Sequence, residues 1–260
     1  MTEMLEYLVF LAFVLLLLLL RMDAGRFGTA EYDDETEGSG WRGWLRRLTW
    51  YALAIGLIFL AYRLYQAPIS QLHLDLGDDR EQSLLLGLIF GAVGTLVAFA
   101  FAWVRYRRLR LPAARHYVGG GINAVATAFI DEALFRGIIM GLLLASNWPP
   151  YLAIAFQAIL YGLATRLGAP GRSRVMLVIS LGVGVVAGWL VLETGGIGAA
   201  LLGHAITRFA IFLSTGHAGQ VRPAGWEPEE EAAYGLPPSG WEFAGDEDDG
   251  MAGYGPAQPG

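Results

Sequence analysis

The chain is too apolar for a water-soluble globular domain, because 55% of its 260 residues are hydrophobic and only 16% are charged, whereas soluble domains carry about 25% charged residues. It has no cysteine, which excludes disulfides, thiolate catalysis and cysteine-ligated metals. The formal net charge of -6 lies largely in the C-terminal tail, and no basic pattern favours nucleic acid. We therefore expect an integral membrane protein that contacts membrane lipid and binds no nucleic acid.

Seven apolar stretches approach the length of about 20 residues that a membrane-spanning helix needs. They cover residues 5–20, 48–65, 84–104, 119–145, 151–164, 175–192 and 197–214. The first stretch follows Glu3 and Glu6 rather than basic residues, and no convincing cleavage site follows it, so we expect an uncleaved anchor. The pattern predicts an all-α fold, a polytopic transmembrane helical bundle of about seven spans.

Most of the 18 basic residues, all of them arginine, fall in alternate predicted loops. Arginine-rich short loops stay on the cytoplasmic side of a membrane. We therefore predict a bacterial inner-membrane protein with its N-terminus outside and its C-terminus in the cytoplasm. The loop arginines are Arg21, Arg26, Arg42, Arg46 and Arg47, then Arg105, Arg107, Arg108, Arg110 and Arg115, then Arg166, Arg172 and Arg174.

The segment 215–260 changes to a composition of glycine, proline and acidic residues. Such a segment buries too little apolar surface to fold alone, which favours a solvated tail. Aromatic residues interleave with the acids, at Trp226, Tyr234, Trp241, Phe243 and Tyr254. The alternative is therefore a segment that orders on a membrane protein partner.

Asp131, Glu132 and Arg136 lie inside the apolar stretch 119–145. Charged side chains at bilayer depth are costly, so they are retained where they pair, line a polar cavity or do chemistry. Residues four apart share one face of a helix, which places Glu132 beside Arg136. This cluster is the first candidate functional site.

Two other predicted spans carry a polar face with the same four-residue spacing. His204 and Arg208 share a face of the last span, and Gln157, Tyr161 and Thr165 form a stripe on the fifth. Because lipid cannot satisfy polar side chains, we expect the three polar faces to meet inside the bundle.

These residues carry a resemblance to a known family. Residues 131–137, DEALFRG, resemble the EExxxRG motif of the CPBP family of intramembrane proteases, which includes the CAAX endopeptidases. Residues 161–165 stand where that family has FxxxH, and residues 193–204 resemble its final motif, a TG turn followed by HxxxN. The order and spacing match over residues 118–214, which predicts a CPBP-like core of four helices.

The resemblance implies proteolysis of a peptide by a water held inside the membrane. In the family, the first glutamate and the motif-two histidine would activate that water, and the final histidine and asparagine would stabilise the oxyanion. The corresponding candidate catalytic residues are Asp131, Glu132, Arg136 and His204.

Three positions depart from the family pattern. Asp131 replaces the first glutamate, Thr165 stands at the motif-two histidine, and Arg208 stands at the asparagine. A threonine hydroxyl cannot act as a base near neutral pH. The two carboxylates and the two arginines, Arg136 and Arg208, can instead neutralise one another as a buried ion-pair network.

Two functions follow. The favoured one is a degenerate protease fold that serves as a scaffold, assembly factor or accessory subunit of a membrane complex. The alternative is an active, glutamate-dependent intramembrane endopeptidase of the CAAX-protease type with altered catalytic residues, in which Glu132 replaces the lost base and Arg208 stabilises the oxyanion. We expect no cofactor.

Metal binding and transport are weaker alternatives. Asp131, Glu132 and His204 have the donor types of a divalent-metal site, but the nearby arginines disfavour a bound cation. A transporter would use a helix break at Gly119–Gly121, yet the chain has no internal repeat to support it.

The predicted organisation has four parts. Residues 1–66 form an N-terminal membrane extension of two spans and an arginine-rich loop, and residues 67–117 contain the third span and a cytoplasmic arginine-rich loop. Residues 118–214 form the four-helix core, and residues 215–260 form the acidic tail.

Overall fold

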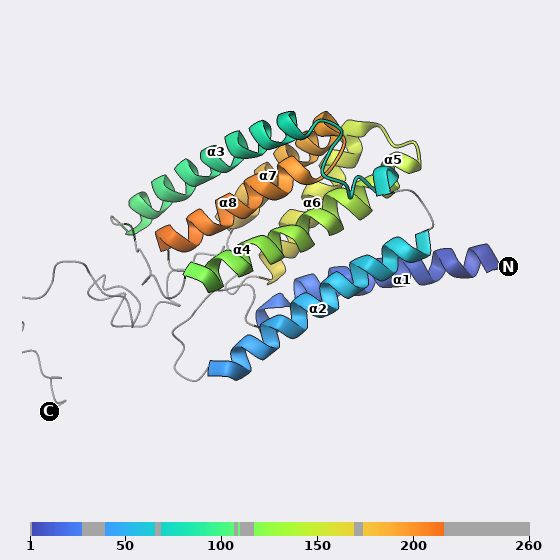
Figure 1. Ribbon diagram of the computed structural model, residues 1–260, viewed down its shortest axis with the longest axis horizontal. Coiled ribbons are helices and arrows are strands. Elements are labelled where there is room, and N and C mark those ends of the chain that lie inside the picture. Colours follow the sequence, from blue (N-terminus) through green and yellow to red (C-terminus); the bar gives the residue numbers. More distant parts are fainter. Residues whose placement is uncertain are drawn as a thin grey trace, which may run out of the picture.

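The structure is a computed structural model that describes residues 2–27, 40–65, 69–106, 109, 117–168 and 174–215. It is all-helical over these residues, which confirms the predicted fold class (Figure 1). The predicted acidic tail lies outside the described residues from position 216 onward.

The helices coincide with the seven predicted apolar stretches. Their bounds are α1 Thr2–Met22, α2 Gly40–Tyr65, α3 Arg80–Tyr106, α4 Tyr117–Asp131, the π-helix η4 Glu132–Met140, α5 Gly141–Ala145, α6 Pro150–Gly168, α7 Arg174–Thr194 and α8 Gly198–Thr215. The short 3-10 helices η1 and η2 cover Ala24–Phe27 and Ile69–Leu72. Because α4, η4 and α5 follow one another without a gap, they form one long helix through the bundle.

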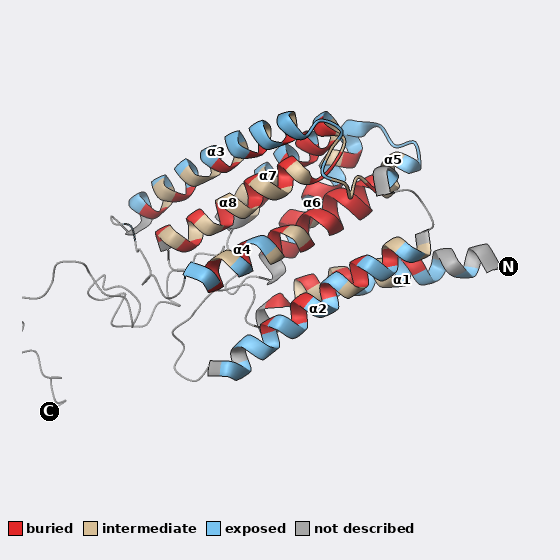
Figure 2. Ribbon diagram, in the orientation of Figure 1, coloured by how far each residue is buried: buried red, intermediate tan, exposed pale blue. Residues whose placement is uncertain are grey.

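Three described helices are long and apolar enough to cross a membrane, over Trp44–Leu64, Arg80–Val104 and Leu177–Thr194. Shorter apolar helices cover Leu8–Met22, Pro150–Thr165 and Gly198–Ser214. Large apolar side chains are exposed along the outer helix faces, while the inward faces are buried (Figure 2). This distribution is typical of an integral membrane protein in contact with lipid.

The bundle is arranged around α4 and α8. Helix α3 packs along α8, α6 packs along α7, and α4 also contacts α8. Helices α1 and α2 form an antiparallel hairpin along one side of the bundle (Figure 1). We call the pair of helices α1 and α2 the N-terminal hairpin; α1 contacts α6 and η4, and α2 contacts α4.

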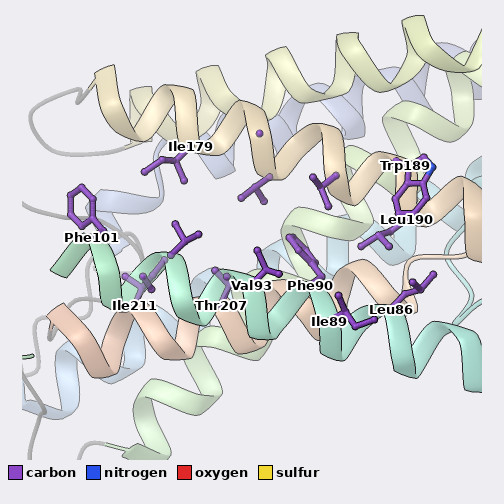
Figure 3. Close-up of a pocket in the computed structure, with 16 residues that line it drawn as sticks. Leu86, Ile89, Phe90, Val93, Phe101, Ile179, Trp189, Leu190, Thr207 and Ile211 are labelled. Carbon is purple, nitrogen blue, oxygen red and sulfur yellow. The ribbon is translucent and has the colours of Figure 1, made fainter. Parts of the chain in front are cut away.

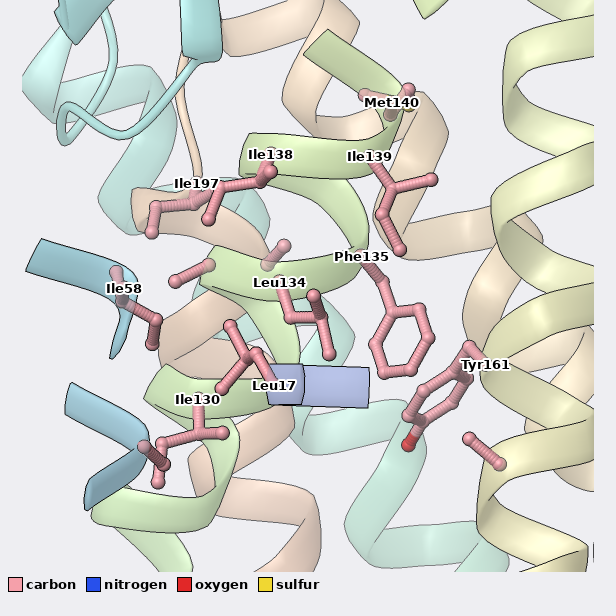
Figure 4. Close-up of a cluster of buried hydrophobic side chains, with 14 of the residues drawn as sticks. Leu17, Ile58, Ile130, Leu134, Phe135, Ile138, Ile139, Met140, Tyr161 and Ile197 are labelled. Atoms are coloured by element: carbon pink, nitrogen blue, oxygen red, sulfur yellow. The ribbon is translucent and has the colours of Figure 1, made fainter. Parts of the chain in front are cut away.

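An apolar core joins the N-terminal hairpin to the long central helix. Leu17 of α1 and Ile58 of α2 are buried in one cluster with Ile130 and Leu134 (Figure 4). Phe135 extends the cluster toward α6, where its ring meets the ring of Tyr161 edge-on at 5.3 Å between centroids. The buried helix that carries the charged residues is therefore packed against α1, α2 and α6 at once.

The loop between α2 and α3 closes one end of the bundle. Ile197, in the turn before α8, donates its N–H to the carbonyl oxygens of His73 and Asp75, and Asp78 donates its N–H to the Thr194 carbonyl. In that turn, Gly195 has a φ of 78°, a conformation that side chains disfavour. These bonds fix the start of α8 and hence the helix that carries the final motif.

The glycines at residues 119–121 lie within α4 and do not break it. The helix break that a transporter would use at this position is therefore absent from the described part of the chain.

Candidate functional site

The central helix changes from α to π geometry at the charged pair. Asp131 is the last residue of α4 and Glu132 is the first residue of η4, and every residue of η4 is buried. Long π-helices are rare, and π turns occur frequently at functional sites. Within this π-helix, Nη1 of Arg136 lies 3.3 Å from Oε1 of Glu132.

Asp131 is held by two arginines from different helices. Arg21 of α1 donates from Nε to Oδ1 of Asp131 and from Nη2 to Oδ2, the second bond measuring 3.1 Å. Arg208 of α8 brings Nη1 to 3.7 Å from the same Oδ2. All three side chains are buried, so this ion-pair network lies inside the protein.

The placement of Arg21 corrects one expectation from the sequence. Arg21 was assigned to the first cytoplasmic loop, but it lies in the last turn of α1 and is only 2% exposed. Three other residues assigned to that loop, Arg42, Arg46 and Arg47, lie near the start of α2, where Arg47 is buried. The predicted network contained two arginines, and the structure adds Arg21 as a third. A lone arginine at the end of a leucine run has no periodic partner that would reveal this role.

Glu132 begins a second chain of contacts. Nδ1 of His204 lies 2.7 Å from Oε1 of Glu132, and the Tyr161 hydroxyl lies 3.2 Å from Nε2 of His204. The consistent assignment has Nδ1–H donating to the carboxylate and the tyrosine hydroxyl donating to Nε2. His204 is thus oriented by partners on both ring nitrogens.

Arg136 is completely buried and lies over the Tyr161 ring, with 4.3 Å from Cζ to the ring centroid. Within the described residues, its guanidinium nitrogens and Oε2 of Glu132 have no hydrogen-bond partner. The 3.3 Å approach between Arg136 and Glu132 is therefore an ion pair without hydrogen-bond geometry. This side of the Glu132 carboxylate keeps an open hydrogen-bonding capacity.

Of the two motif-two residues, Tyr161 contacts His204 and Thr165 does not make a hydrogen bond among the residues described. Thr165 is buried, but its hydroxyl has no hydrogen-bond partner among the residues described. Gln157, the third member of the predicted stripe, donates to the Gly184 carbonyl of α7 at 2.7 Å. The structure thus brings one of the three stripe residues into hydrogen-bond contact with His204.

A polar cluster on α4 was missed by the sequence reasoning. Asn123 accepts hydrogen bonds from the hydroxyls of Tyr51, on α2, and Thr127, the second at 3.1 Å. Asn123, Thr127 and Asp131 are spaced four residues apart on α4. That spacing was the available signal for a polar face leading to Asp131.

The side chains considered as metal ligands contact other residues instead. Asp131 binds two guanidinium groups, and Glu132 binds His204 and faces Arg136. No group of three histidine or acidic side chains with metal-site geometry occurs in the described ranges. We derive no metal site from this arrangement.

An apolar groove lies beside the charged site, between α3 and α7 with α8 contributing to its lining (Figure 3). Its cavity volume is about 450 Å³, and Phe90, Trp189 and Ile211 are among its lining residues. Thr207 also lines it, one position before Arg208. The lining does not include the charged residues of the site.

Comparison with known proteins identifies the region that carries this site. Residues 115–210 match the family described as Type II CAAX prenyl endopeptidase Rce1-like. They form an Rce1-like domain. No curated protein and no solved structure matches the chain. The resemblance inferred from the three motifs is therefore confirmed for the region from α4 to α8.

The Rce1-like domain supplies all of the site residues predicted from the sequence. Arg21 and Tyr51, which contact Asp131 and Asn123, lie before the matched region. The charged site is therefore assembled from the Rce1-like domain together with the N-terminal hairpin.

Proposed function

We propose that this protein is a scaffold, assembly factor or accessory subunit of a membrane complex, in which an Rce1-like site has become a structural ion-pair network. The observation that carries the proposal is the state of Asp131, which stands at the position of the family's first glutamate. It is fully buried and bound by Arg21, with Arg208 close by.

The contacts of Asp131 oppose a role in activating water. Hydrogen bonds and nearby cations stabilise the ionised carboxylate and weaken its tendency to accept a proton. A general base also needs a hydrogen-bond path to the water that it deprotonates. Both oxygens of Asp131 face guanidinium nitrogens instead.

A second candidate function is an active intramembrane endopeptidase that uses Glu132. The observation that favours it is the orientation of Glu132, which binds His204 through Oε1 while Oε2 has no hydrogen-bond partner in the described chain. That oxygen could accept a hydrogen bond from a water, and a peptide would be the substrate. Thr165 and Arg208 would then stand at altered catalytic positions.

The setting of the proposed function is the bacterial inner membrane, with the N-terminus outside and the C-terminus in the cytoplasm. Arginines near the ends of the membrane helices support this orientation: Arg42 and Arg46 near the start of α2, Arg105 near the end of α3, Arg166 near the end of α6 and Arg174 at the start of α7. We also propose that the chain divides into the four segments 1–66, 67–117, 118–214 and 215–260. Segment 215–260 is the candidate contact for a protein partner.

The test compares proteins that co-purify from mild detergent with wild type and with Glu132→Gln. Mass spectrometry would identify the partners and their N- and C-termini, and Glu81→Gln, at an exposed position of α3, is the matched control. If the protein is a scaffold, all three samples should contain the same stoichiometric, uncleaved partners. A protein that is cleaved with wild type and Glu81→Gln but accumulates intact with Glu132→Gln would establish the endopeptidase instead.

A further inference from the structure

The pair of Arg21 and Asp131 joins two parts of the chain that are 110 positions apart. Arg21 belongs to the N-terminal hairpin, whereas Asp131 belongs to the Rce1-like domain. The guanidinium binds both carboxylate oxygens, and both side chains are buried. Such two-bond pairs fix geometry as well as charge.

The same interface contains a further polar contact between the two parts. The Tyr51 hydroxyl of α2 donates to the Asn123 side chain of α4. Within the hairpin, the indole N–H of Trp50 donates to the Leu20 carbonyl at 3.0 Å, one residue before Arg21. A hydrogen bond therefore joins the end of α1 to α2, next to Arg21, which binds Asp131.

Inside a membrane, polar contacts between helices contribute to holding the helices together. Lipid tails are as apolar as leucine side chains, so burial of apolar surface does not by itself hold helices together in a bilayer. A carboxylate buried in the membrane without its partner is strongly unfavourable. Undocking the hairpin would remove from Asp131 both hydrogen bonds that Arg21 donates to it.

We propose that Arg21 is a positioning residue through which docking of the N-terminal hairpin and the state of Asp131 are coupled. The proposal goes beyond the function assigned above, since it holds whether or not the site is catalytic. Coupling of this kind is reciprocal. A membrane partner that binds the hairpin therefore changes the Asp131 site, and loss of the charge on Asp131 loosens the hairpin.

The test measures the distance between the hairpin and the domain in the full chain reconstituted in lipid nanodiscs. Because the natural chain has no cysteine, spin labels can be attached to cysteines introduced at Leu48 of α2 and Val125 of α4, both exposed. Double electron–electron resonance then gives the distance distribution. The variants are Arg21→Met, Arg21→Lys, Asp131→Asn, the Arg21→Met/Asp131→Asn double variant, and the control Arg46→Met, which removes an exposed arginine of the same hairpin.

We expect one narrow distribution for wild type and for the control, and a broadened or shifted one for Arg21→Met and for Asp131→Asn. Arg21→Lys keeps the charge and should lie between wild type and Arg21→Met. The double variant should be broader than wild type but narrower than either single variant, because it removes the pair without leaving a buried charge unpaired. It also leaves neither Arg21 nor Asp131 as an unpaired charge, so it remains informative where a single variant fails to fold.

Two results would overturn the proposal. One is a wild-type distribution in the double variant, which would mean that the hairpin docks without the pair. The other is additive broadening from the two single variants, which would mean that Arg21 and Asp131 act independently.

Discussion

Asp131 and Glu132 are neighbours in the sequence with different roles in the structure. Asp131 is bound by Arg21 and approached by Arg208, whereas Glu132 contacts His204 and Arg136. Adjacent side chains of a helix point in different directions, so Asp131 meets Arg21 of α1 and Arg208 of α8, while Glu132 meets His204 at another position of α8. The site is therefore two linked clusters, and a substitution at each should have its own consequence.

Asp131→Ala should destabilise the protein by about 3–5 kcal/mol, the typical cost of leaving a buried charge without its partner. The uncompensated charge would be Arg21, which is almost fully buried. Thermal unfolding in detergent, followed by circular dichroism, measures the effect, with Glu81→Ala as the exposed control. An unfolding midpoint equal to wild type would show that the network contributes nothing to stability.

Tyr161→Phe should cost about 0.5–1.5 kcal/mol, because it removes one buried hydrogen bond to His204. The phenylalanine ring would still lie beneath Arg136. Tyr161→Leu removes that cation–π contact as well and should cost about 0.5–2 kcal/mol more. Equal unfolding midpoints for the two variants would argue that the ring does not stabilise Arg136.

Thr165→Val tests whether the hydroxyl at the motif-two histidine position takes part in catalysis. The threonine hydroxyl is buried without a hydrogen-bond partner in the described structure, so replacing it with a methyl group should be neutral or slightly stabilising. Unfolding midpoints and the set of co-purified partners should both match wild type. If wild type cleaves a co-purifying protein and this variant leaves the same protein intact, Thr165 would have a catalytic role.

At the level of helices, much of the fold could be predicted from sequence. The apolar stretches located every long helix, because length and composition determine whether a helix suits a bilayer. The four-residue spacing correctly placed Glu132 beside Arg136, and His204 does meet Glu132. Local periodicity was sufficient for these features.

Other features depend on tertiary contacts that leave no local pattern. Arg21 pairs across 110 positions and resembled a loop residue at the end of an apolar run. The π-helix at Glu132–Met140 is a geometry that hydrophobic periodicity does not distinguish from an α-helix. Tyr161, not Thr165, reaches His204, and only the relative positions of α6 and α8 decide which one does.

Gly198→Ala tests how the loop between α2 and α3 positions α8. A Cβ at Gly198 would lie 2.3 Å from the Leu76 carbonyl oxygen, so the loop backbone would have to move. We expect destabilisation by about 1–3 kcal/mol, as for overpacking of a core. Gly121→Ala is the matched control, because a Cβ there meets nothing within 4 Å and should stabilise α4 by about 0.5–1 kcal/mol. Equal midpoints for the two variants would contradict this view of the loop.

In the whole molecule, the Rce1-like domain and the N-terminal hairpin share one buried charged site. Residues 115–210 carry the family resemblance, and α1 contributes Arg21 from outside it. Helix α3 also lies before the matched region, yet it packs along α8. The site and the bundle therefore depend on segments that the family resemblance does not include.

The most direct test of the central claim replaces the ion pair with apolar residues in the Arg21→Met/Asp131→Leu variant. Replacing a buried ion pair by apolar side chains of similar volume is often neutral or stabilising, whereas removing one partner is not. If the network is structural, this variant should unfold at or above the wild-type midpoint and co-purify with the same uncleaved partners. A folded variant that accumulates the intact form of a protein cleaved by wild type would contradict the account and establish a catalytic site.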